Sequence, residues 1–362
     1  MLDLLPIAVL ACSVRTTTAS LRTTPIVATT TIAPSPLALF TSEVCLQHNP
    51  GAKGKRPDGT PNLHPEQVDR LASLQAAMRG PWKAEFGSLL HVLEPEVDAT
   101  EAQLLRVHTP QYLEFLQQKF AQSQRRPPMR VNLDRDTVIS GGTQAAASRA
   151  AGLVIAAVDA VLSRRDDEPS RAFVMVRPPG HHAEAGRCGG FCIYNNVLVG
   201  VAHAQAMHSI GNVAILDFDV HHGNGDEEIS WCDPTRLYAS THEEALWPGT
   251  GATRGCDGLH GQILSQPLPP HCGSEQFREV WRSEIFPVVR EFRPDAVFLS
   301  AGFDAHADDP LASMQLTEAD FEWITKEVTS LGLPVISVLE GGYNVEALES
   351  CVRAHVRALI NS

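Results

Sequence analysis

The stretch VAILDFDVHHGNGD, residues 213–226, contains an apolar run that is followed at once by carboxylates and imidazoles. Its first eight residues have the pattern of a buried strand, because short apolar runs are typical of strands covered on both faces. Asp219 and His221 lie two positions apart, and residues i and i+2 of an extended chain point to the same side. The stretch therefore predicts a buried strand that delivers a carboxylate and an imidazole to one point.

Strand-like and helix-like segments alternate along the chain from about residue 140. Strands are expected at 172–176, 213–220, 236–241, 295–302 and 334–342, and helices at 144–165, 195–209, 274–292, 317–331 and 345–360. This alternation predicts an α/β fold, with a single domain whose parallel multi-stranded sheet is flanked by helices on both faces. The region from 43 to 140 is less regular, and two amphipathic helices are expected there, at 64–78 and 101–120.

Composition and charge exclude several classes of protein. A hydrophobic content of 43% and a charged content of 20% are ordinary for a globular chain. The net charge of -13 argues against direct nucleic-acid binding, although it permits a cationic partner. No stretch approaches 18 consecutive apolar residues, so no membrane span is expected. The eight cysteines form no CxxC pair, and we expect them to be reduced thiols in an intracellular compartment.

The first 42 residues differ in kind from the rest. From Leu4 to Ser42 there is no Asp or Glu, and there are only two arginines and nine threonines. Such a segment is typical of an organellar transit peptide, and a disordered tail without an address is the alternative. We therefore expect a leader at 1–42 and a folded domain at 43–362. The leader favours a plastid or mitochondrial location over the cytoplasm or nucleus.

Five of the expected strands end on side chains that can bind metals or transfer protons. They are Arg177, His181 and His182 after the first strand, then Asp217, Asp219, His221, His222 and Asn224, then His242, then Asp304 and His306, and finally Tyr343. Open parallel sheets bind ligands outside the carboxyl ends of their strands, so we expect these side chains to share one face. Two adjacent histidines in a turn mean little alone, but the other strand ends favour a catalytic site.

Asp219 and His221 can grip one ion, and Asp304 at a neighbouring strand end is the natural third ligand. Three protein ligands leave a position for water and substrate, as in catalytic rather than structural zinc sites.

Five segments resemble the signature sequences of the zinc-dependent histone deacetylase family, which has the arginase/deacetylase fold. They are RPPGHHA, GFCIYNN, DFDVHHGNGD, SAGFDAHADDPLASMQLT and LEGGYN. The resemblance runs in order from about residue 64 to the last expected helix, nearly the whole chain beyond the leader. RPPGHHA and HHGNG resemble class II enzymes more than class I, and the leader and SAGFDAHADDPLA are similar to the plant and algal organellar branch.

The resemblance implies a role for each residue of the site. Asp219, His221 and Asp304 would hold one Zn²⁺, and His181 and His182 would lie beside the reacting water. Asp217 and Asn224 would orient these two rings, and Tyr343 would donate its hydroxyl to the substrate carbonyl. Gly190, Phe191, Trp247 and Leu311 would line the substrate tunnel. A structural K⁺ would lie near Asp217, Asp219, His221 and Ser240.

The implied activity is hydrolysis of acetyl-lysine amides by metal-activated water in a deacetylase domain at 43–362. The substrate would be a histone, with a role in chromatin regulation, or a non-histone protein. The alternative is an amidohydrolase of acetylpolyamines or other small acetylated amines. Two positions bear on substrate specificity, and the first of them departs from the family pattern. Trp247 replaces Phe or Tyr at the rim, and Leu311 is apolar where an acid would favour a polyamine.

Two other functions fit less well. A binuclear arginase-type ureohydrolase requires acidic residues where this chain has Gly223 and the segment DAH. A non-catalytic acyl-lysine reader would be expected to lack a metal ligand or the tyrosine, and all of them are present.

Overall fold

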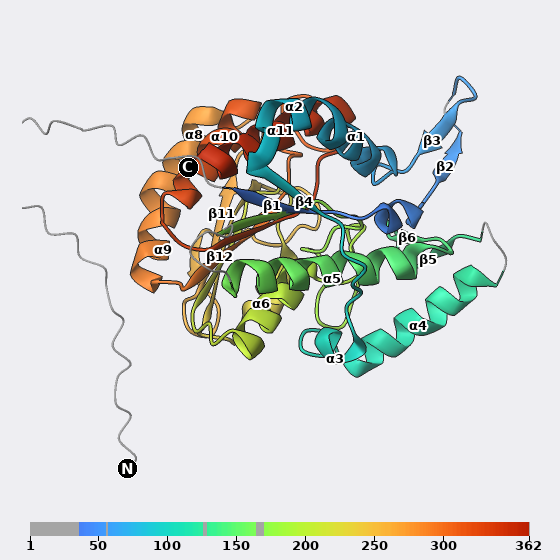
Figure 1. Ribbon diagram of the computed structural model, residues 1–362, viewed down its shortest axis with the longest axis horizontal. Helices are drawn as coiled ribbons and strands as arrows, with labels where there is room; N and C mark the ends of the chain where they lie inside the picture. The colour runs from blue at the N-terminus through green and yellow to red at the C-terminus, as the bar shows by residue number, and fades with distance from the viewer. Residues whose placement is uncertain (1–35, 56, 126–128, 164–169, 362) are drawn as a thin grey trace, which may run out of the picture. The chain divides into compact units, whose positions relative to one another are not determined.

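The computed structural model describes residues 36–361, except 56, 126–128 and 164–169 (Figure 1). Its centre is a nine-stranded sheet with the strand order β10-β11-β9-β8-β12-β13-β7-β1-β4. The strands of this sheet are β1 (Leu37–Phe40), β4 (Leu90–Leu93), β7 (Arg171–Val174), β8 (Val213–Asp217), β9 (Arg236–Glu243), β10 (Gly255–Asp257), β11 (Ile263–Leu268), β12 (Ala296–Ala301) and β13 (Val335–Leu339). All neighbours pair in parallel except β10, which is antiparallel to β11. The predicted parallel sheet is therefore confirmed, with one antiparallel edge strand added.

Helices cover both faces of the sheet, as Figure 1 shows. They are α1 (Asp69–Ala77), α2 (Lys83–Phe86), α3 (Glu101–Leu104), α4 (Pro110–Gln124), α5 (Thr143–Leu162), α6 (Asn196–Met207), α7 (Asn224–Ser230), α8 (Ser274–Val280), α9 (Phe286–Phe292), α10 (Glu318–Thr329) and α11 (Val345–Asn361). On one face α5 and α6 pack together, α5 against β7 and β13 and α6 against β12. On the other face α11 packs against β1 and α10. Two small hairpins, β2 (Ala52–Lys55) with β3 (Pro61–Leu63) and β5 (Val131–Asn132) with β6 (Val138–Ile139), lie outside the sheet.

Prolines modify two of the predicted helices. The segment 101–120 forms two helices rather than one, because Pro110 begins α4 at a position where its missing amide hydrogen has no cost. The residue before a proline disfavours the helical conformation, so Thr109 is extended and its side chain caps α4. In the segment 274–292 a π-helical turn, Trp281–Ile285, precedes Pro287.

The folded domain begins before residue 43, where the sequence predicts that it starts. Residues 1–35 of the expected leader lie outside the described residues, but Leu37–Phe40 forms β1 between β7 and β4. Leu37 and Leu39 are completely buried, so these residues belong to the core. The apolar tetrapeptide LALF follows Pro36 directly and lies in a segment without acidic residues, so its local sequence resembles a leader rather than a strand.

Helix α5 is long and apolar enough to cross a membrane by length and composition alone. Its packing explains this composition in another way, because it packs against β7 and β13 of the sheet and against α6, and most of its residues are buried. Within the described residues it is a core helix of the α/β fold.

Candidate active site

Four neighbouring strands, β8, β12, β13 and β7, supply the candidate site. They run in parallel, so their carboxyl ends lie along one edge of the sheet. Asp217 is the last residue of β8. Asp219 and His221 follow β8, Asp304 follows β12, Tyr343 follows β13, and His181 and His182 follow β7. Contacts between side chains from different strands bring these residues together.

Asp219, His221 and Asp304 place their ligand atoms within 4.8 Å of one another. His221 Nδ1 lies 3.1 Å from Asp219 Oδ1 and 3.1 Å from Asp304 Oδ2. Burial alone lowers the pKa of His221, but the two carboxylates outweigh it and raise this pKa to about 10. The site therefore favours a positive charge at the point where the three groups meet.

Glycines in the neighbouring loops leave space around these carboxylates. A Cβ atom on Gly302 would lie 2.0 Å from Asp219 Oδ2, and one on Gly341 would lie 2.0 Å from Asp304 Oδ2. The amide of Gly341 also donates a hydrogen bond of 2.8 Å to Asp219 Oδ2. The close backbone approach holds the carboxylates in place. Two buried carboxylates and one imidazole form a donor set that suits a divalent transition metal.

The tandem histidines have different partners. His181 Nδ1 lies 3.1 Å from Asp217 Oδ2, and His182 Nδ1 lies 2.9 Å from Asn224 Oδ1. Burial lowers the pKa of both rings. At His181 the charges of Asp219 and Asp217 outweigh burial and hold the pKa well above its usual value. At His182 the neighbouring positive rings of His181 and His221 add to burial, so its pKa lies well below the usual value. His182 is thus the neutral ring of the pair and can accept a proton.

Sequence reasoning missed two buried carboxylates beneath His181. Glu340 Oε2 accepts hydrogen bonds from the amides of Gly180 (2.6 Å) and His181 (3.1 Å), and burial raises the pKa of Glu340 to about 8. Asp226 accepts from Asn195 Nδ2 at 2.7 Å, and burial raises its pKa to about 7. A signal for Glu340 was present, because an acid that ends an apolar strand run and precedes two glycines rarely lies in a core without a purpose.

Tyr343 is held by groups from two other segments. Its amide donates a hydrogen bond of 2.7 Å to Asp309 Oδ2. The guanidinium of Arg70 lies over its ring, 4.8 Å from the ring centroid. Arg70 also donates to the carbonyl oxygens of Gly342 and Glu340, both at 2.6 Å. Arg70 was missed as well, although an arginine on the apolar side of the helix predicted at 64–78 was a signal.

A cavity of about 170 Å³ opens above these groups. The four predicted tunnel residues, Gly190, Phe191, Trp247 and Leu311, all line it, together with His182, His221, Tyr343, Asp136 and Leu246. Asp136 and Leu246 were missed by sequence reasoning. Gly190 has a φ of +53°, and a Cβ atom there would lie 2.3 Å from His182 Cδ2. This position therefore requires glycine on both conformational and steric grounds.

The residues expected to hold a monovalent cation are also close together. Asp217 and Ser240 are paired across β8 and β9, and the amide of Asp219 donates to Asp217 Oδ1 at 3.0 Å. Ser240 Oγ lies 3.0 Å from His242 Nδ1.

Comparisons with known proteins identify one family. The family model described as "Histone deacetylase domain" matches residues 64–359. "Type-2 histone deacetylase 2" of Dictyostelium discoideum is 34% identical over 88% of this chain and 20% of its own length. "Histone deacetylase 14, chloroplastic" of Arabidopsis thaliana is 40% identical over 58% of this chain and 52% of its own length. The chain thus spans about a fifth and about half of these two relatives.

Among solved structures, the crystal structure of the HDA15 HD domain superposes with a TM-score of 0.79 and 29% identity. The superposition covers 90% of each chain.

Proposed function

Since the chain belongs to the histone deacetylase family, we propose that it hydrolyses the amide of acetylated lysine side chains. One observation carries this proposal: His182, His221 and Tyr343 line a single narrow cavity directly beside the Asp219–His221–Asp304 group. A cavity of about 170 Å³ suits a slender acyl-lysine stem better than a bulky substrate.

The cation at Asp219, His221 and Asp304 is proposed to be Zn²⁺, because three nitrogen and oxygen ligands with an open position are typical of catalytic zinc. Bound there, Zn²⁺ polarises the acetyl carbonyl and lowers the pKa of a water molecule. A structural K⁺ is proposed beside Asp217, Asp219, His221 and Ser240, where oxygen donors from two adjacent strands meet.

Side chains of the protein transfer the protons of the reaction. His182, whose pKa is lowered, accepts a proton from the attacking water and later donates one to the departing lysine nitrogen. His181, whose pKa is raised, remains paired with Asp217, and its positive charge keeps His182 neutral between steps. The Tyr343 hydroxyl donates a hydrogen bond to the oxygen that gains negative charge in the tetrahedral transition state.

Small acetylated amines, including acetylpolyamines, are the second candidate substrates. Trp247 is 41% exposed at the mouth of the cavity, with its ring 4.5 Å from that of His182, so it narrows the entrance. Leu311 in the same wall has no charge to attract a second ammonium group. The missing charge at Leu311 favours an acetyl-lysine side chain over a polyamine.

A turnover panel tests the proposal. Purified protein with one equivalent of Zn²⁺ is assayed on acetylated histone and tubulin peptides, acetylpolyamines and small N-acetylarylamines. We expect release of acetate from peptides with a higher kcat/KM than from the small amines, and no release by Asp304→Asn. Turnover of small amines alone would replace the substrate class, and no turnover of any acetamide would refute the activity.

The leader is proposed to direct the protein to a plastid or mitochondrion. Support comes from the absence of acidic residues and the nine threonines between Leu4 and Ser42. Residues 1–45 fused to a fluorescent protein are expected to give organellar fluorescence, and a diffuse cytosolic signal would contradict the proposal.

A further inference from the structure

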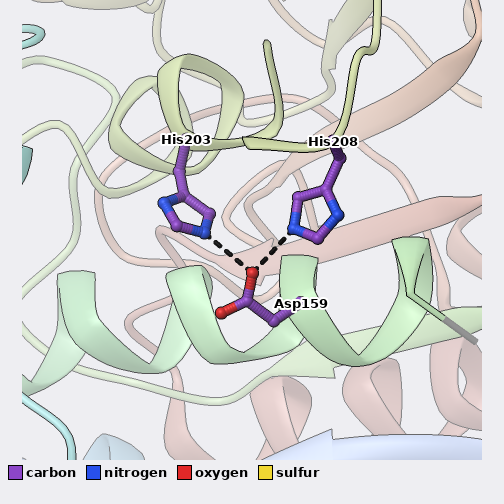
Figure 2. A group of neighbouring side chains, drawn as sticks. All are labelled: Asp159, His203 and His208. Atoms are coloured by element: carbon purple, nitrogen blue, oxygen red, sulfur yellow. Dashed lines mark hydrogen bonds and ion pairs between the residues drawn. The ribbon is translucent and has the colours of Figure 1, made fainter. Parts of the chain in front are cut away.

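A second group of metal-ligand side chains lies away from the cavity, on the helices α5 and α6. It consists of Asp159, His203 and His208, whose ligand atoms lie within 4.8 Å of one another (Figure 2). Asp159 belongs to α5, His203 to the last turns of α6, and His208 follows the end of α6 directly. These helices precede β7 and β8, so their carboxyl ends lie at the edge of the sheet opposite to the candidate active site.

Both imidazoles point their Nε2 atoms at the same carboxylate oxygen, as Figure 2 shows. His203 Nε2 lies 2.8 Å and His208 Nε2 lies 2.7 Å from Asp159 Oδ1. The His203 and His208 side chains are 7% and 13% exposed, whereas Asp159 is 52% exposed. Two nearly buried rings thus converge on a carboxylate at the surface, which leaves a side open to solvent.

We propose that Asp159, His203 and His208 form a binding site for a divalent transition metal such as Zn²⁺. Two imidazoles and one carboxylate suit Zn²⁺, Co²⁺, Ni²⁺ or Cu²⁺ rather than Mg²⁺ or Ca²⁺, which prefer oxygen ligands. With three protein ligands, water fills the remaining position of a tetrahedral ion. The site is separate from the candidate catalytic group and does not depend on the proposed deacetylase activity.

The Asp159 oxygen needs only a small movement to make room for an ion between it and each ring. In a tetrahedral site with bonds of about 2.0–2.1 Å, ligand atoms lie roughly 3.3 Å apart. Asp159 Oδ1 must therefore move roughly 0.6 Å away from the two rings. Its half-exposed side chain allows this movement.

Arg106 fixes which ring nitrogen of His203 carries the hydrogen. Its Nη1 lies 3.2 Å from His203 Nδ1, and a guanidinium can only donate, so Nδ1 is the acceptor and Nε2 carries the hydrogen that faces Asp159. A metal at Nε2 requires the hydrogen on Nδ1 instead, which forces the exposed Arg106 side chain to turn away. Arg106 therefore opposes metal binding both by its charge and by its hydrogen bond.

Metal stoichiometry tests the site. The full chain is dialysed against a micromolar excess of Zn²⁺ as the sole added ion, and bound metal is counted by elemental analysis. We expect two ions per chain in the wild type and one in each of Asp159→Asn and His203→Ala. Asp304→Asn is expected to keep one ion, and the control His260→Ala, an exposed histidine outside both groups, is expected to keep two.

Circular dichroism monitors folding, and the exposed Asp159→Asn change keeps the test valid if His203→Ala unfolds the chain. Equal ion counts in the wild type and folded Asp159→Asn would overturn the proposal and leave a hydrogen-bonded contact between α5 and α6. The test of this site does not depend on the candidate catalytic group, because Asp304→Asn shows separately whether that group binds an ion.

Arg106→Gln provides a second test with the opposite sign. The Gln side-chain oxygen can accept a hydrogen bond from Nδ1–H, as partners of metal-bound histidines commonly do. We expect this variant to bind the second Zn²⁺ about tenfold more tightly, the lower end of the usual effect of such partners. Unchanged or weaker binding would overturn the assignment of His203 Nε2 as a ligand atom.

Discussion

Tyr343 is the phenol in the wall of the cavity, and its position is fixed by contacts that do not involve its hydroxyl. The backbone amide bonds to Asp309, Arg70 lies over the ring, and Phe191 packs edge-on at 5.7 Å. Phenylalanine at this position keeps the ring contacts and the backbone bond. The hydroxyl can therefore be removed without loss of structure.

We expect Tyr343→Phe to lower kcat on an acetyl-lysine peptide by about 10²–10³, the usual effect of removing one oxyanion donor. The melting temperature should hardly change. Steady-state kinetics and a thermal melt measure both quantities, and full activity in the variant would refute the role of the hydroxyl.

Addition of one methyl group at Gly341 tests the geometry of the candidate metal site. A Cβ atom there would lie 2.0 Å from Asp304 Oδ2 and 2.5 Å from Asp219 Oδ2. We expect Gly341→Ala to displace both carboxylates, so that the catalytic metal and the activity are lost together. The matched control is Gly273→Ala, where an added Cβ meets nothing within 4 Å. The bound metal per chain is measured in both variants. A Gly341→Ala protein that binds as much metal as the wild type would contradict the geometry.

At the scale of elements, Glu66 connects the loops that carry the candidate catalytic side chains. Its carboxylate accepts from Arg177 Nε (2.5 Å) and Nη2 (2.6 Å), and from Arg70 Nη1 (3.1 Å). Arg177 begins the loop that leads to His181, and Arg70 holds the loop that leads to Tyr343. All three charged side chains are completely buried. The group thus ties the loop after β7 to the loop after β13.

Removal of the charge of Glu66 leaves two guanidinium groups buried without a counter-charge. We expect Glu66→Gln to lower the free energy of unfolding by about 3–5 kcal/mol, the usual loss when a buried ion pair is broken. Urea denaturation near pH 7 measures this. A loss within error of zero would show that the pairing does not stabilise the fold.

The Glu66 carboxylate also makes the stability of the fold depend on pH. Burial raises the pKa of Glu66, but Arg177, His48 and Arg70 outweigh burial, so the folded-state pKa lies well below its usual value near 4.5. A depressed pKa contributes stability that is complete above pH 4.5 and is lost as the pH falls toward the folded-state pKa. We expect this acid-dependent loss in the wild type and not in Glu66→Gln, as measured by unfolding curves between pH 3 and 7.

At the scale of the whole molecule, β1 makes the fold depend on residues that resemble a leader. Leu37, Leu39 and Phe40 are at most 3% exposed, and burial of each such side chain contributes about 1.5–3 kcal/mol. Their sum is comparable with the total stability of a typical domain, about 5–15 kcal/mol.

A chain that starts at residue 43 is therefore expected to be insoluble or unfolded, whereas one that starts at residue 36 retains activity. Yield, circular dichroism and turnover of the two chains compare them directly. Equal folding and turnover would mean that the sheet tolerates the loss of β1.

The α/β class, the sheet with helices on both faces and the side chains at the strand ends could all be predicted from the amino-acid sequence. These properties follow from local periodicity and from the rule that parallel strands end at one edge. The tandem imidazoles, Asp219 and Tyr343 could be recognised because each comes a few residues after an apolar run. Leu37–Phe40 could not, since a four-residue strand carries little periodicity, nor could β11, which contains Gln266 and Pro267.

The distant residues that support these side chains could be identified only from the packing of the folded chain. Glu66 meets Arg177 and Arg70 meets Tyr343 across more than 100 positions of the chain, and Asp159 meets His203 and His208 only because α5 packs against α6. Local patterns describe how a segment buries its own surface. They do not specify the pairing of charges between segments, because that depends on the register and packing of elements far apart in the sequence.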